Sequence, residues 1–332
     1  MMYVVGDVHL RSEEPFFSVT KEFLNDIVSM VSYGDVVIFT GDFFHRSRPY
    51  SEELKVARKF FEKMKDKRVH VGILAGNHEY FRDRDTWAED VFADYDIDFI
   101  EWPTLGFYYG VQIMFMPWMP LRHIVQYSSA KNIKEYYETL FNKYFDKVGK
   151  DRPLYLIYHF EDETVFGGPE VGVDLSCFEK KFGKLVRRVG GHIHNPDSNY
   201  LGAPYATRKD ETGFDRYILK IDSNADDDEK IPVKQKIEFK TLSYEELKTE
   251  RFDEEIRYVV KVLDTPSLEA TKSIIDSKDN VWLDDYELKF NEERDVDKDK
   301  SDELFSIKEF LDMYIKHNKV DPNTANYLLS LF

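Results

Sequence analysis

Short runs of apolar residues alternate with longer segments of helical periodicity along roughly the first two hundred residues of the chain. The apolar runs predict strands at 3–5, 36–39, 69–74, 111–116, 154–158 and 185–189. Between them, apolar residues recur every three or four positions at 23–31, 54–64 and 133–144. That spacing is typical of helices with one buried face. The alternation predicts an α/β fold in which helices cover a sheet.

A strongly acidic stretch interrupts this pattern at 222–229. It has no apolar periodicity and its like charges repel, so we expect a solvated connection and a domain boundary. We therefore assign residues 1–222 to a first domain and residues 230–290 to a second. Within the second domain, strands are predicted at 237–239, 258–263 and 281–290, and a helix at 266–275 with proline in its first turn. This pattern indicates a small α+β module.

A second charged stretch, 291–302, is predicted to be an acidic linker. After it, the segment 303–332 has an apolar face at helical spacing, and Asp321-Pro322 is a start signal for a last short helix. Two short helices with an apolar face need a surface to pack on. That surface belongs either to a partner or to the chain's own folded part.

Composition and charge narrow the class of protein. With 332 residues, 42% of them hydrophobic and 15% aromatic, the chain can fill a substantial core. The single cysteine, Cys177, cannot form an internal disulfide, and neither a secretory signal nor a membrane-spanning apolar stretch is apparent, so we expect a soluble, cytoplasmic protein. A net charge of −17 argues against coating nucleic acid by bulk electrostatics. Any attraction for DNA would be local, metal-centred or supplied by a partner.

Five polar clusters directly follow predicted strands, and together they hold six of the nine histidines. The clusters lie at 6–9, 41–45, 76–79, 158–160 and 191–194. Groups at the carboxyl ends of strands converge in an α/β sheet. Imidazole, carboxylate and amide groups are donors for manganese, iron or zinc, and the lack of cysteine pairs argues against a thiolate zinc site. One such cluster alone is usually a turn with a hydrogen-bonded histidine, but five in order predict a shared metal site.

The order of these motifs resembles the signature of calcineurin-like metallophosphoesterases: Asp-x-His, Gly-Asp, Gly-Asn-His-Glu, His and Gly-His-x-His. In the second cluster, His45 follows Asp42 by three residues and Ser-Arg-Pro comes next, which resembles SbcD-type nuclease subunits of double-strand-break repair. Serine/threonine phosphatases carry Gly-Asp-x-x-Asp-Arg-Gly there. The segment 200–204, with Gly213-Phe214, is also similar to SbcD-type proteins. The resemblance covers the first domain well and the remainder only by layout.

This resemblance implies a fold and a metal-ligand set. The fold would be a metallophosphoesterase β-sandwich flanked by helices, with a small α+β capping domain and a C-terminal helical segment. Two divalent ions, expected to be manganese, would be bound. One would be held by Asp7, His9, Asp42 and His194, and the other by Asp42, Asn77, His159 and His192. Asp42 would bridge both ions.

The resemblance also implies roles beside the metals. His78 would sit over the phosphate, where it neutralises charge or protonates the leaving oxygen. His45 would orient the phosphate and the neighbouring nucleotide, although an equally weighted alternative is that it only orients a metal ligand through a hydrogen bond. Arg46 and Arg48 would line a DNA path, while charged loop residues are by default only solvated.

As a whole, the resemblance implies a metal-dependent DNA nuclease, both exonuclease and single-strand endonuclease, in an SbcCD-type complex for DNA repair, recombination and replication. Residues 303–332 would dock on the coiled coil of an SMC-like ABC-type ATPase, and the nuclease would form a homodimer. A phage-encoded member would act in the host cytoplasm. One alternative is a phosphoprotein phosphatase or small-molecule phosphodiesterase, against which His45 and the long appended region count. Another is a non-catalytic scaffold, although every expected ligand type is present.

Overall fold

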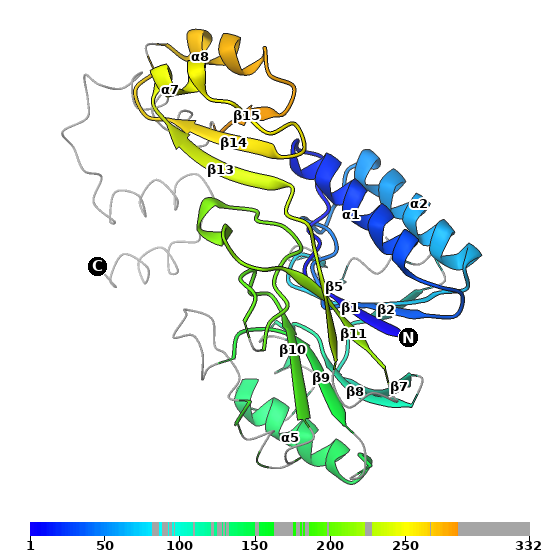
Figure 1. The fold of residues 1–332 in the computed structure, drawn as a ribbon. Helices are drawn as coiled ribbons and strands as arrows, with labels where there is room; N and C mark the ends of the chain where they lie inside the picture. Colours follow the sequence, from blue (N-terminus) through cyan, green and yellow to red (C-terminus); the bar gives the residue numbers. More distant parts are fainter. Residues whose placement is uncertain are drawn as a thin grey trace, which may run out of the picture. The chain divides into compact units, whose positions relative to one another are not determined.

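The structure is a computed structural model of the chain. It describes residues 1–81, 86–87, 92, 95, 97–108, 110–120, 123–124, 128, 130, 133–149, 153–162, 175–176, 180, 182, 186–197, 199–222, 228–265 and 267–284. Met1–Leu283 form one compact unit, shown as the coloured ribbon in Figure 1. The predicted linker at 291–302 and the predicted helices at 303–332 lie outside the described residues.

A six-stranded sheet contains the first three predicted strands. Its strand order is β12 (Glu229–Pro232), β11 (Tyr217–Ile221), β1 (Met2–Val5), β2 (Val36–Phe39), β3 (His70–Leu74) and β6 (Ile97–Ile100). The strands β1, β2, β3 and β6 run parallel, whereas β11 and β12 are antiparallel additions. Every residue of β1 and β2 is buried, as expected for parallel strands covered on both faces.

Two helices pack beside each other over this sheet, α1 (Phe16–Met30) and α2 (Ser51–Asp66) (Figure 1). The apolar stripe of α1, including Phe23 and Ile27, shares one core cluster with Phe60 and Phe61 of α2. The start of α2 is fixed by Glu53, whose carboxylate accepts the backbone N–H of Tyr50 at 2.7 Å. Both predicted helices are confirmed, and α1 extends further toward the N-terminus than its periodicity indicated.

A second sheet has four strands in the order β10 (Val186–Gly191), β9 (Leu154–His159), β8 (Val111–Met116) and β7 (Thr104–Tyr108). Its inner face shares a core cluster with the six-stranded sheet, in which Val4 and Ile38 pack with Ile113 and Ile157. Its other face is covered by the predicted helix α5 (Ile133–Phe145), through a cluster that includes Tyr137. The expected α/β class, with sheets flanked by helices, is confirmed.

Some strands were not predicted from the apolar pattern. These are β6, β7, β11, β12 and the short hairpin of β4 (Tyr80–Phe81) and β5 (Thr86–Trp87). Most of β7 is only partly buried, and β12 is largely exposed, so neither strand produces a continuous apolar run. The residues 230–232, which we placed in the second domain, pair with β11 in the six-stranded sheet. The division into domains stays a prediction.

A third, parallel sheet consists of β13 (Ile237–Leu242), β14 (Arg257–Val262) and β15 (Val281–Leu283). With α7 (Tyr244–Thr249) and α8 (Leu268–Ile275) it encloses its own apolar cluster around Val260. The helix α8 starts at Leu268 behind the capping residue Ser267, two residues later than predicted. Among the described residues, no helix has the length and apolar character needed to cross a membrane.

Candidate metal centre

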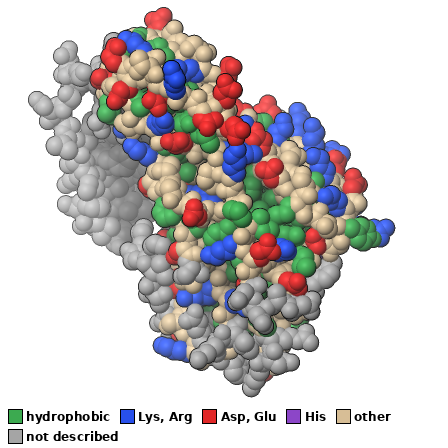
Figure 2. Space-filling view, viewed as in Figure 1, with side chains coloured by type: hydrophobic (Ala, Val, Ile, Leu, Met, Phe, Trp, Pro, Cys, Tyr) green, Lys and Arg blue, Asp and Glu red, His purple; other side chains and the backbone are tan. Residues whose placement is uncertain are grey.

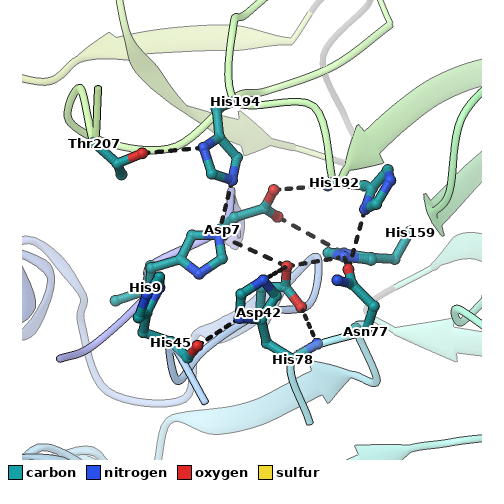
Figure 3. A network of polar contacts seen from close by, with 12 residues as sticks. Asp7, His9, Asp42, His45, Asn77, His78, His159, His192, His194 and Thr207 are labelled. Carbon is teal, nitrogen blue, oxygen red and sulfur yellow. Dashed lines mark hydrogen bonds and ion pairs between the residues drawn. The ribbon is translucent and has the colours of Figure 1, made fainter. Parts of the chain in front are cut away.

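The polar clusters converge at the carboxyl ends of strands from both sheets. Asp7 follows β1, Asp42 follows β2, and His78 follows β3, while His159 ends β9 and His192 follows β10. Figure 3 shows these side chains facing one another in a single network. The structure thereby brings together all seven predicted ligands and both predicted catalytic histidines: Asp7, His9, Asp42, Asn77, His159, His192, His194, His45 and His78.

The backbone is bent sharply where the strands release these side chains. His9, Asp42 and His192 have φ values of 48°, 49° and 79°, a region that costs a non-glycine residue about 1–3 kcal/mol. Glycines provide the space around them: a Cβ at Gly76 would collide with the Asp42 carboxylate, and one at Gly191 with that of Asp7. The glycines in the motifs therefore allow close approach of the backbone to the buried carboxylates.

Asp7, His9 and His194 form one group of potential ligands. Their donor atoms lie within 4.8 Å of one another, and the Nε2 atoms of His9 and His194 are 2.8 Å apart. Asp7 is fully buried, and its carboxylate accepts hydrogen bonds from Thr40 Oγ1 at 3.1 Å and from the His192 backbone N–H at 2.6 Å. Two imidazole nitrogens and a carboxylate that converge in this way suit a divalent cation.

Asp42 lies between this group and a second one. Its Oδ2 atom is 3.7 Å from His9 Nε2 on one side and 3.3 Å from His159 Nε2 on the other. Asn77 Oδ1 lies 3.2 Å from His159 Nε2 and 3.1 Å from His192 Nδ1. Separations of this size match neighbouring ligands around an ion with bond lengths of about 2.0–2.2 Å. The residues could therefore ligate divalent cations, and Asp42 lies between the two groups.

Protonation in this cluster is set by burial and by the two carboxylates. Burial opposes the charge on His159, but Asp42 and Asp7 outweigh it and raise its pKa to about 10. Burial raises the pKa of Asp7, whereas His159 and His9 outweigh burial and lower the pKa of Asp42 well below its usual value. The pKa of His192 falls to about 4 because of burial and His159. Without a cation, His159 therefore holds a proton beside the carboxylates.

The two remaining histidines lie beside the candidate ligands. The His78 backbone N–H donates to Asp42 Oδ1 at 3.0 Å, and its Nδ1 hydrogen-bonds the His45 carbonyl at 2.5 Å. The ring of His9 is 4.7 Å from that of His78 and 5.5 Å from that of His45. Burial, followed by the Arg11 guanidinium, lowers the pKa of His45 to about 4. His45 thus orients His78 through its carbonyl, while its imidazole lies at the same site.

Two buried carboxylates support the centre and had no assigned role. Glu79, at the end of the third cluster, accepts the backbone N–H groups of Asp42 at 3.0 Å and Gly76 at 2.9 Å. Burial and the Asp42 carboxylate raise the pKa of Glu79 to about 8. Glu211 accepts from His194 Nδ1 at 2.8 Å, which orients that ring. Glu79 is visible within its motif, whereas nothing in the local pattern marks Glu211.

The two arginines predicted to contact DNA make contacts within the protein. Arg46 forms an ion pair with Glu13, and its guanidinium lies 4.4 Å above the ring of Tyr50. Arg48 lies 5.7 Å above the ring of Phe81. The charge of Arg46 is therefore partly compensated by an acidic neighbour. On the face seen in Figure 2, acidic and basic side chains are interspersed over the described surface.

Comparison with known proteins identifies the family of the chain. The family model of calcineurin-like phosphoesterases matches residues 2–196. No curated protein gives a significant match. Among solved structures, the protein of unknown function AQ665 from Aquifex aeolicus is 16% identical, with a TM-score of 0.29, over 49% of this chain and 81% of that one. The match covers every strand of the two packed sheets except β11 and β12, and Asp and His residues gather at the strand ends. The chain therefore belongs to the calcineurin-like phosphoesterase family and is a metal-dependent phosphoesterase.

Proposed function

We propose that this phosphoesterase is a DNA nuclease that hydrolyses phosphodiester bonds as the nuclease subunit of an SbcCD-type DNA-end-processing complex. The observation that supports it is the place of His45, three residues after Asp42 and hydrogen-bonded through its carbonyl to His78. The motif that continues as Ser47-Arg48-Pro49 resembles SbcD-type nucleases and differs from the phosphatase motif. A histidine pair beside the metal ligands suits a bulky phosphodiester with an alkoxide leaving group.

The proposed ligand sets assign a task to each side chain. Asp7, His9, Asp42 and His194 would hold one cation, and Asp42, Asn77, His159 and His192 the other. When bound, the two cations supply hydroxide at neutral pH and neutralise the phosphate. Glu79 and Glu211 keep Asp42 and His194 in position. The strained turns at His9 and Asp42 place their donor atoms before a metal arrives.

His78 is proposed to donate a proton to the leaving oxygen of the substrate. Because its Nδ1 is engaged by the His45 carbonyl, its Nε2 is the atom that can carry a second proton toward a leaving oxygen. That Nε2 atom lies 4.0 Å from Asp42 Oδ2, and the side chain is 31% exposed, so substrate can reach it. In this role His78 is a catalytic acid, while His45 positions it.

The wider assembly is also a proposal. The net charge of −17 leaves little general attraction for DNA, which suits recruitment by an ATPase partner through residues 303–332. The third sheet, β13 to β15, is proposed to cap the site and to help admit DNA. Manganese as the native metal, a homodimer and a cytoplasmic location complete the proposal.

A nuclease assay tests it. Linear duplex and single-stranded DNA are incubated with the protein and manganese, with and without a co-expressed ATPase partner. We expect release of nucleotides, and loss of that release on addition of a chelator. Release of phosphate from phosphopeptides without cleavage of either DNA would contradict the proposal and favour a phosphatase.

A further inference from the structure

Arg11 lies two residues after His9, the last residue of the first polar cluster, and presents donors that the described part of the protein does not use. Its Nε and Nη2 atoms are buried, and neither has a hydrogen-bond partner among the described residues. None of the ion pairs of the described residues includes Arg11. A guanidinium that is withdrawn from water without a partner is costly, because its charge and its N–H groups lose their hydration.

Two other arginines near the centre have partners within the protein for their charge or their N–H groups. Arg216 is buried, and it donates to the carbonyls of His194, Ala203 and Glu211. Arg46 is paired with Glu13. Arg46 Nε also lacks a hydrogen-bond partner, but Arg46 has an ion pair, whereas Arg11 has neither an ion pair nor a hydrogen bond among the described residues and is acted on by Glu13 and Glu211 only from a greater distance. The unused donors of Arg11 indicate an anion that binds from outside the chain.

The position of Arg11 is fixed on two sides. Leu10 accepts the backbone N–H of His45 at 3.0 Å, which places the next residue beside the second metal-binding motif. The guanidinium lies 3.5 Å above the centre of the Phe16 ring. Stacking on an aromatic ring holds the planar fork of an arginine while leaving its edge free for an anion. Phe16 in turn packs against Phe239 of the third sheet.

The neighbouring backbone places Arg11 on the His45 side of the centre. The backbone of Leu10, the residue before Arg11, hydrogen-bonds to Phe43 and His45, and the ring of His45 is 5.5 Å from that of His9, a candidate metal ligand. An anion bound to Arg11 would therefore lie next to the phosphate at the metals. An arginine fork can bind two oxygens of one phosphate at once.

We propose that Arg11 binds a second phosphate of the substrate, adjacent to the scissile one, and so makes the enzyme prefer polynucleotides over isolated phosphodiesters. This inference rests on the proposed nuclease function. The subsite consists of the Arg11 fork stacked on Phe16, with the backbone of His45 hydrogen-bonded to the neighbouring Leu10. Its ligand class is a phosphodiester one nucleotide away from the cleaved bond. Arg11 is here a residue for substrate positioning and specificity.

The test compares Arg11→Gln, Arg11→Lys and Arg11→Met with the unchanged protein on single-stranded oligonucleotides. We expect KM to rise about 10- to 100-fold in Arg11→Gln and Arg11→Met, because both variants lose a charged hydrogen-bond donor to the substrate. The change in kcat should be smaller. Arg11→Lys should recover part of the affinity, because it keeps the charge and loses the fork. The slope of log KM against log salt concentration should also decrease by about one, the value for one lost phosphate contact.

Substrates with one neutral linkage locate the contact. Each phosphate of a short oligonucleotide is replaced in turn by a methylphosphonate. In the unchanged protein, KM should rise when the methylphosphonate replaces one particular phosphate next to the cleaved bond. In Arg11→Gln, the same replacement should leave KM unchanged. Arg58→Gln is the matched control, because Arg58 is 68% exposed on α2 and pairs with Glu62. Melting temperatures check that the variants fold.

The outcomes separate this inference from the proposed function. If the unchanged protein cleaves oligonucleotides, and Arg11→Gln has the same KM and responds in the same way to each methylphosphonate, then Arg11 only packs against Phe16 and the inference is wrong. Equal losses in kcat for bis(p-nitrophenyl) phosphate and in kcat/KM for oligonucleotides would also overturn it, since that pattern reports a damaged centre. If the unchanged protein hydrolyses only bis(p-nitrophenyl) phosphate and no oligonucleotide, both the proposed function and the inference fall.

Discussion

At the scale of single residues, the centre depends on side chains that each contact residues from more than one of the five polar clusters. The Asp42 carboxylate accepts the His78 N–H through Oδ1, while its Oδ2 faces His9 and His159. Glu79 ties the backbone of Asp42 to that of Gly76. A change at one of these positions therefore disturbs the second and third motifs together, whereas a change at His78 removes only a group that faces the substrate.

Substitution His78→Ala should retain manganese binding and lower kcat for DNA cleavage by about 10²–10⁴, the usual contribution of a positioned acid. Calorimetric titration with manganese and single-turnover cleavage measure the two effects. His70→Ala is the matched control, because His70 is 41% exposed and pairs with Asp98. Full cleavage activity in His78→Ala would reject the acid role.

Metal binding should release protons, because His159 must lose one before it can coordinate. Burial disfavours the imidazolium, but Asp42 and Asp7 raise the pKa of His159 to about 10, so the metal-free protein carries that proton at neutral pH. Affinity for manganese should rise with pH between about 6 and 9, roughly tenfold per pH unit for one proton. Calorimetry at pH 7 in buffers of different ionisation enthalpy counts the protons, and a count of zero would contradict this protonation state.

At the scale of elements, the strands in which every residue is buried could be predicted from the sequence. Every residue of β1, β2, β8 and β9 is buried, and each forms a continuous apolar run. The largely exposed β12 has no such run. The ligands were predictable for the same reason, since they follow buried strands, whereas Glu211 comes from the short 3-10 turn Lys209–Glu211 and meets His194 only through the tertiary fold.

The turn after β3 offers a test at this scale. A Cβ at Gly76 would collide with the Asp42 carboxylate, so Gly76→Ala should displace Asp42 and weaken manganese binding by about 10–100-fold, as loss of ligand support does. Gly213→Ala is the control: it has a φ of +84° and no atom within 4 Å of the added Cβ. It should cost only about 1–2 kcal/mol of stability, the usual cost of a left-handed backbone for a residue with a Cβ. Equal manganese affinity in both variants would show that the turn does not hold Asp42.

At the scale of the whole chain, the metal site lies where two sheets meet, and such packing is not encoded in local periodicity. Cluster positions predicted that the ligands converge, but the sandwich itself came from the family resemblance. The third sheet is joined to α1 through Glu22, which pairs with Lys236 at 3.0 Å and with Arg257. A shared apolar cluster of Val19, Ile237 and Val259 lies beside these ion pairs. Those contacts connect the proposed cap to the helix that follows Arg11.

We infer that Asp42 lies between two metal ions held by side chains from both sheets. Anomalous diffraction from crystals soaked in manganese tests it directly. We expect two peaks on either side of Asp42, about 3.5–4 Å apart, one beside His9 and His194 and the other beside Asn77 and His192. A single peak away from Asp42, or ions bound only at other carboxylates, would contradict it.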